Sequence, residues 1–163
     1  MKLAGFNQLP PEQAQAVLAH CVAIKRWQQA MVAARPYASL GALCQQARLL
    51  AQEWGEADFV QALAAHPRIG ERARGEHKEA ALSRQEQAAV GEDAELRQAL
   101  RIANQDYEQR FGYLFLIRAK GRSGQEMLAE LQRRLANTPA QELGEALGQL
   151  REITLLRLQE SII

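Results

Sequence analysis

The sequence predicts an all-α fold, a single compact domain of about seven or eight helices spanning residues 1–163. Apolar residues recur every three or four positions along most of the chain, which is the spacing of one face of a helix. Three Ser/Thr-x-x-Glu/Gln tetrapeptides stand where helices are expected to begin, and this spacing is typical of a capping box. With 163 residues, 47% of them hydrophobic, the chain can bury one sizeable core.

The first 65 residues predict three helices. A long one begins at Pro11 and ends before Pro36, a second follows the capping residue Ser39, and a shorter one covers residues 57–65. Residues 68–81 are charged, contain two glycines and show no apolar stripe. They are predicted to form a long loop, or a loop with a short helix, and such loops in compact domains are often functional.

The rest of the chain predicts four more helices. Capping boxes at residues 83–86, 123–126 and 138–141 each begin one, and a fourth, with its stripe on every third or fourth residue, covers about 96–111. Residues 113–117 are apolar throughout. Periodicity alone does not decide whether this run is a buried strand or a buried helix.

Charge and composition argue against several classes of function. Twenty Lys and Arg against nineteen Asp and Glu give a net charge of +1, which argues against general nucleic-acid binding and against an electrostatic membrane anchor. The sequence shows no secretory signal and no run of about eighteen apolar residues, so a cytoplasmic protein without a membrane span is expected. Two cysteines and three scattered histidines lack zinc-ligand spacing, so no metal site is predicted.

The first candidate for chemistry is His66, which directly precedes Pro67. Proline restricts the residue before it to extended backbone, so we expect His66 where a helix stops, with its imidazole presented. Histidine titrates near neutral pH and is the side chain that most often transfers protons. Taken alone, however, the dipeptide favours an ordinary helix end that carries His.

Two further features supply what a proton-transfer site needs. Glu86 could orient and polarise His66, and Gln87 offers both a donor and an acceptor to an amide-like ligand. Backbone amides at the start of the helix that Ser83 begins could bind a carboxylate or carbonyl oxygen. Spacing alone favours a simple cap for Ser83 and Glu86. Arg118, which follows the apolar run, could supply positive charge.

These residues together resemble the family of 2-oxo-4-hydroxy-4-carboxy-5-ureidoimidazoline (OHCU) decarboxylases over nearly the whole chain. The ordered set of motifs carries the resemblance, because each motif alone is weak. The set comprises Phe6-Asn7, Trp27, Arg35-Pro36-Tyr37, Ala65-His66-Pro67-Arg68-Ile69-Gly70, Ser83-Arg84-Gln85-Glu86-Gln87, Asn104-x-x-Tyr107-x-x-Arg110-Phe111-Gly112, Phe115-Leu116-Ile117-Arg118-Ala119-Lys120-Gly121-Arg122-Ser123, Glu142-Leu143 and Arg157-Leu158.

The resemblance implies an all-α, generally dimeric enzyme that needs neither a metal nor an organic cofactor. The implied reaction is decarboxylation of OHCU, a small molecule on the route from urate to allantoin, with (S)-allantoin as the product. The family's catalytic histidine corresponds to His66, and we expect Glu86 to hold its ring. The family's substrate-contacting positions correspond to Pro67, to Ser83, Arg84, Gln85, Glu86 and Gln87, and to Phe115, Leu116, Ile117, Arg118 and Ala119.

The chain departs from the family at a few positions. Many relatives have His-Pro-Asp-Leu where this chain has His66-Pro67-Arg68-Ile69, and Phe-Pro-Phe where it has Tyr113-Leu114-Phe115. Relatives often carry a small residue at the position of Arg118. These differences leave the expected catalytic set intact.

Other functions stay open. A non-catalytic helical domain that binds a partner in a groove between helices would explain the stripes and caps, but gives no reason for the set of His66, Glu86 and Gln87. The same scaffold could instead decarboxylate or hydrolyse a related ureido or imidazolone acid, because a fold does not fix a reaction. A metal hydrolase has the least support.

Overall fold

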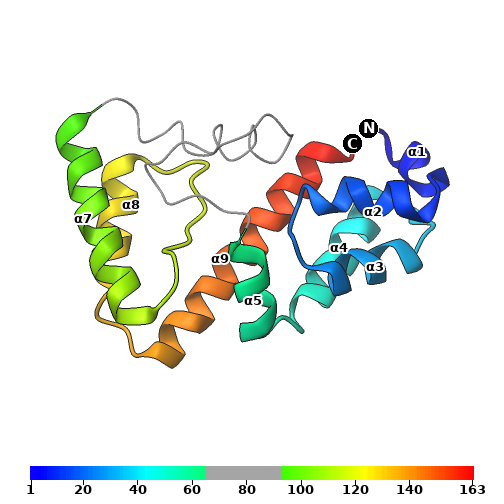
Figure 1. Ribbon diagram of the computed structural model, residues 1–163. Coiled ribbons are helices and arrows are strands. Elements are labelled where there is room, and N and C mark those ends of the chain that lie inside the picture. Colours follow the sequence, from blue (N-terminus) through cyan, green and yellow to red (C-terminus); the bar gives the residue numbers. More distant parts are fainter. Residues whose placement is uncertain (65–92) are drawn as a thin grey trace. The chain divides into compact units, whose positions relative to one another are not determined.

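The computed structural model describes residues 1–64 and 93–163, and it places eight α-helices in them (Figure 1). No strand occurs in these two stretches, which confirms the all-α prediction for them. Contacts divide the chain into two units, residues 1–62 with 151–163 and residues 63–150. Among the described helices, none combines the length and the apolar character that crossing a membrane requires.

The first unit contains the N-terminal helices and the last part of α9 (Pro139–Ser161). Trp27 and Trp54 pack edge to face at its centre, with ring centroids 6.1 Å apart, and the indole Nε1 of Trp27 donates to Ala47 O at 3.2 Å. The two ends of the chain pair here, since Ile163 N donates to Met1 O at 2.8 Å. The helices are α1 (Leu3–Gln8), α2 (Pro11–Ala19), α3 (Lys25–Ala33), α4 (Leu40–Ala51), α5 (Glu56–Leu63), whose last residue belongs to the other unit, and the end of α9 (Pro139–Ser161).

The prediction of one long helix that begins at Pro11 and ends before Pro36 is wrong. Residues 20–24 interrupt it and separate α2 from α3. Cys21, Val22 and Ile24 are all fully buried in this break, whereas a continuous helix would keep Cys21 and Ile24 on one face and turn Val22 away from it. The break leaves Val22 O without a helical partner, and the side chain of Gln28 donates to it at 2.7 Å.

Polar side chains of two sequence motifs hold the first unit together. The amide of Asn7 pairs twice with the backbone of Tyr37, donating to its carbonyl and accepting from its N–H, both at 2.9 Å. Arg35 Nη1 donates to Phe6 O and Leu9 O, both at 2.8 Å. These carbonyls belong to the end of α1, where a helix leaves backbone acceptors unsatisfied. Within the part of the chain that the structure describes, these motif residues therefore have a structural role.

Tyr37 makes the first unit sensitive to alkaline pH. Its buried hydroxyl donates to Met31 O at 2.6 Å, and burial raises the pKa of Tyr37 to about 12, although nearby Arg35 opposes the shift. Because the folded pKa exceeds the ordinary value near 10, this stabilisation is complete below pH 10 and is lost as pH rises toward 12. We expect the free energy of unfolding to fall between pH 9 and 12 by about 2 kcal/mol more in the wild type than in Tyr37→Phe. Urea unfolding at each pH measures this difference, and parallel curves for the two proteins would contradict it.

The second unit contains α7 (Ala94–Phe111), α8 (Gly124–Arg134) and the first part of α9. The side chain of Ser123 accepts from Glu126 N at the start of α8. Thr138 and Gln141 form a full capping box at the start of α9, with reciprocal bonds of 3.0 and 3.2 Å. Both predicted helix starts are confirmed. The predicted loop 68–81 and the capping box at 83–86 lie outside the described residues.

The apolar run 113–117 forms neither of the two predicted structures. It belongs to an irregular segment between α7 and α8 (Figure 1). Phe115, Leu116 and Ile117 are nonetheless buried, and each is at most 4% exposed. Side chains from other elements pair with backbone groups of this segment, so it needs neither a helix nor a sheet to bury them.

Candidate active site

Only one part of the predicted site lies in the described residues. This part is the segment of residues 115–119, called the substrate segment below because family resemblance assigns it contacts with substrate. The other predicted site residues, His66, Pro67, Ser83, Arg84, Gln85, Glu86 and Gln87, lie outside the residues that the structure describes. The geometry available is therefore that of the substrate segment and of the second unit around it.

Three side chains hold the backbone of the substrate segment. Arg134 Nη1 donates to Leu116 O at 2.9 Å. Gln149 Oε1 accepts from Arg118 N at 2.9 Å, and Arg122 Nε donates to Arg118 O, also at 2.9 Å. All three bonds involve the even-numbered residues of the segment.

Several backbone groups of the odd-numbered residues have no partner in the part of the chain that the structure describes. The carbonyls of Phe115 and Ile117 and the amides of Ile117 and Ala119 make no hydrogen bond to any residue in 1–64 or 93–163. These three residues are only 2–4% exposed, and buried backbone groups nearly always have a partner. The segment thus presents donors and acceptors in the manner of a free strand edge, which a ligand with amide groups can complement.

A buried ion pair supports this arrangement. Arg134 is 1% exposed and Glu142 is fully buried, and Arg134 Nε lies 3.1 and 3.0 Å from the two carboxylate oxygens of Glu142. The hydroxyl of Tyr107 also donates to Glu142. Burial, and then the hydrogen bond to Glu142, raise the pKa of Tyr107, so this phenol remains a neutral donor. The Arg134 guanidinium also lies over the Phe115 ring, 4.5 Å from its centroid.

Sequence reasoning missed Arg134 and Gln149. Arg134 had a signal, because it follows Met127 and Leu131 at helical spacing and so continues the buried stripe of α8 with a charge. A charged residue on such a stripe is rarely buried unless it is paired. Gln149 had no such signal in the sequence, since a single glutamine on a long helix is usually exposed. Tyr107 belongs to one of the family motifs, but its sequence context assigned no partner to its hydroxyl.

The motif on α7 is also structural in the second unit. Arg110 Nη2 donates to Asn137 O at 2.6 Å. Tyr107 and Phe111 pack with ring centroids 4.8 Å apart. Gly112 ends the helix at φ +80°, a conformation that favours glycine.

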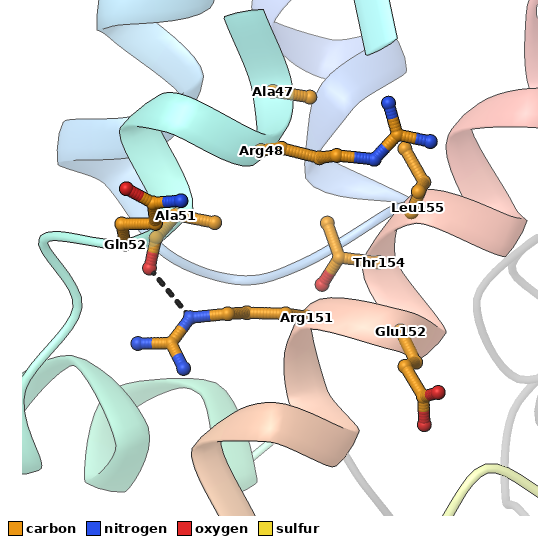
Figure 2. A pocket seen from close by; sticks show the side chains of 8 residues that line it. All are labelled: Ala47, Arg48, Ala51, Gln52, Arg151, Glu152, Thr154 and Leu155. Atoms are coloured by element: carbon orange, nitrogen blue, oxygen red, sulfur yellow. Dashed lines mark hydrogen bonds between the residues drawn. The ribbon is translucent and has the colours of Figure 1, made fainter. Parts of the chain in front are cut away.

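The first unit contains a separate pocket of about 270 Å³ between α4 and the last part of α9. Arg48 and Arg151 lie on either side of Thr154 (Figure 2), and Arg151 Nε donates to Ala51 O at 2.9 Å. None of the predicted site residues lines this pocket. Its lining residues are Ala47, Arg48, Ala51, Gln52, Arg151, Glu152, Thr154 and Leu155. Across the described ranges, no three His, Cys, Asp or Glu side chains gather in a way that could hold a metal ion.

Comparison with known proteins gives a family match over most of the chain. Residues 7–159 match the family model of OHCU decarboxylase. The 2-oxo-4-hydroxy-4-carboxy-5-ureidoimidazoline decarboxylase of Haloferax volcanii is 30% identical over 129 residues, which cover 77% of this chain and 74% of that protein. A crystal structure of OHCU decarboxylase in the presence of (S)-allantoin superposes with a TM-score of 0.72 at 29% identity, covering 86% of this chain and 92% of that one.

Two of the curated relatives are much longer than this chain. The uric acid degradation bifunctional protein TTL of Arabidopsis thaliana is 34% identical over 105 residues, which make up 62% of this chain but only 32% of that protein. The uric acid degradation bifunctional protein of Bacillus sp. (strain TB-90) is 26% identical over 129 residues, which make up 25% of that protein, so the chain spans about a third or less of the length of these two curated relatives.

Proposed function

This chain belongs to the OHCU decarboxylase family, and on that premise we propose that it removes CO2 from OHCU and releases (S)-allantoin. The observation that carries the proposal is the family match over residues 7–159. The Haloferax volcanii relative, most of whose length the chain covers, is named for this same reaction.

The chemistry of the proposed substrate explains why this reaction can proceed without a cofactor as an electron sink. OHCU bears a carboxylate and a hydroxyl on one ring carbon. When the bond to the carboxylate breaks, its electron pair enters the adjacent conjugated C–N system and CO2 leaves. One proton must then reach one face of the ring to give (S)-allantoin rather than a racemate. We assign this proton transfer to His66, with Glu86 orienting its ring.

The substrate segment would bind the amide groups of OHCU. Its backbone groups that lack a partner in residues 1–64 and 93–163 alternate between acceptors and donors. The ureido group and ring of OHCU carry complementary N–H and C=O groups. The segment's apolar side chains are buried, and hydrogen bonds strengthen where water is excluded. The proposal assigns further substrate contacts to Pro67 and to residues 83–87 by their positions in the family motif.

We propose a homodimer for the assembly, because the family is generally dimeric, and the cytoplasm for its location. Light scattering tests the first statement, since a dimer of this chain has twice the monomer mass of 18.2 kDa. Cell fractionation tests the second.

The decisive test of the reaction follows circular dichroism of allantoin while OHCU is generated in situ from urate. Rapid appearance of one enantiomer with the wild type, against slow racemic product in its absence, is the expected result. If the protein turns over a related ureido acid faster than OHCU, the family assignment stands but the proposed substrate is wrong. Saturable peptide binding without any turnover would favour a helical binding domain.

Arg118 is proposed to bind an acceptor group of the substrate. Its Nε is buried and has no hydrogen-bond partner among the residues that the structure describes, and a buried guanidinium N–H without an acceptor is costly. A substrate oxygen would satisfy it in both the ground and the transition state. We therefore expect Arg118→Met to raise KM about 10- to 100-fold and to change kcat much less.

Steady-state kinetics of Arg118→Met, with Lys120→Met as the matched loss of an exposed neighbouring cation, checks this prediction. We expect Lys120→Met to keep the wild-type KM. A KM for Arg118→Met equal to that of the wild type would remove Arg118 from the binding site and leave the decarboxylase function untouched.

A further inference from the structure

Gln149 lies on α9 and reaches the backbone of the substrate segment, 31 residues away in sequence. Its side-chain oxygen accepts from Arg118 N at 2.9 Å. The side chain is only partly buried, and this contact adds little to the core. The main effect of this hydrogen bond is to orient a single peptide group.

The peptide that Gln149 holds also carries the Ile117 carbonyl. A trans peptide is planar, and its C=O and N–H point in opposite directions. The bond from Arg118 N to Gln149 therefore directs the Ile117 carbonyl to the other side of the backbone. The same rule applies to the other two contacts. Arg134 binds the Leu116 carbonyl, which shares a peptide group with Ile117 N. Arg122 binds the Arg118 carbonyl, which shares a peptide group with Ala119 N.

The three side chains thus fix, one each, three of the backbone groups in the substrate segment that have no hydrogen-bond partner among the described residues. An irregular segment has no ladder of backbone hydrogen bonds to prevent its peptide groups from rotating. In the described part of the chain, the Ile117 carbonyl lacks any other hydrogen bond that would set its direction. Gln149 is also the one of the three that can be changed without removing a charge.

We propose that Gln149 is a positioning residue, which aims the Ile117 carbonyl at an N–H of a ureido or cyclic amide substrate. This inference rests on the proposed function. A misplaced acceptor would leave the substrate badly oriented for proton delivery, and small displacements of bound substrate cost up to about 100-fold in rate. Gln149→Met, which has similar length but no acceptor, is expected to lower kcat/KM between about 10- and 100-fold.

The experiment compares three variants with the wild type on OHCU. Gln149→Glu keeps an acceptor oxygen at the same place, so we expect it to retain kcat/KM within about threefold, which a loss of packing alone would not explain. Gln159→Met is the matched control, because Gln159 lies on the same helix, and its long contact at 3.9 Å is to the sulfur of Cys44. Hydrogen exchange of the peptide that covers residues 115–119 should accelerate in Gln149→Met, while exchange in α7 and α8 stays unchanged.

The outcomes separate the two proposals. Absence of turnover by the wild type would refute the proposed function and with it the role of Gln149. An active wild type together with a folded Gln149→Met of unchanged kcat/KM would refute the positioning role alone. Should Gln149→Met fold poorly, Gln149→Ala removes the same acceptor without adding bulk, and an Ala variant with wild-type kcat/KM would refute the role equally.

Discussion

Arg134→Met is expected to lower the free energy of unfolding by about 3–5 kcal/mol, because it leaves the carboxylate of Glu142 buried without its cation. Glu142 is fully buried, and Arg134 is 1% exposed. The remaining partners of Glu142, Tyr107 and Asn137, donate neutral hydrogen bonds and cannot balance a buried charge. Urea unfolding followed by far-UV circular dichroism measures the loss.

The neighbouring Arg133 provides the control for this prediction. It pairs with Glu130 and Glu145, but its side chain is 51% exposed, and exposed ion pairs contribute at most about 1 kcal/mol. Arg133→Met should therefore have a small effect beside that of Arg134→Met. A loss below about 1 kcal/mol in Arg134→Met would contradict a buried pair.

A double variant separates the contribution of the ion pair to stability from that of the packing around it. Replacing both members of a buried ion pair with apolar residues of similar size is often neutral, whereas removing one member is not. We expect Arg134→Met combined with Glu142→Met to be more stable than Arg134→Met alone. Its substrate segment would still lack the bond to Leu116 O, so activity is expected to stay low even where stability recovers.

Helix starts were the most predictable part of the fold, because a cap involves residues that are adjacent in sequence. Ser39, Ser123 and Thr138 each accept a hydrogen bond from the backbone three residues later, as their sequence patterns predict. The break between α2 and α3 has no such local signal. It contains neither proline nor glycine, and it depends on the burial of Cys21, Val22 and Ile24 against the rest of the first unit.

The irregular substrate segment could not be predicted from local pattern for the same reason. Residues 113–117 are apolar, as in a buried strand or helix, but the backbone of Leu116 and Arg118 pairs with side chains 4 to 31 residues away. Nothing within residues 113–119 specifies those partners. Contacts that are distant in sequence decide the local conformation here.

The candidate site was predictable mainly through family resemblance, and the structure sorts its motifs by role. Asn7, Arg35 and Arg110 pair with backbone carbonyls or amides of the scaffold. Motif membership therefore does not by itself indicate contact with substrate. The roles of His66 and of residues 83–87 stay predictions, since these residues lie outside the part of the chain that the structure describes.

His66→Ala is expected to lower kcat by about 100- to 10,000-fold, which is the usual contribution of a positioned general acid or base. The imidazole is the group whose ordinary pKa suits proton exchange near neutral pH. Alanine removes the proton donor without adding bulk, so we expect the helical circular dichroism signal to remain. His77→Ala is the matched control, because His77 lies in the predicted loop 68–81, shortly after His66 in the sequence, and has no assigned role.

The stereochemistry of the product distinguishes proton transfer by His66 from a role in binding alone. OHCU loses CO2 spontaneously to give racemic allantoin, so loss of the proton donor should remove both the rate enhancement and the excess of the (S) enantiomer. If His66→Ala still forms one enantiomer rapidly, orientation by the substrate segment would suffice and another group must deliver the proton. If rate falls but the (S) excess persists, a slower donor such as water reaches the same face. Only the combined loss of rate and of enantiomeric excess, with both retained in His77→Ala, supports His66 as the group that delivers the proton.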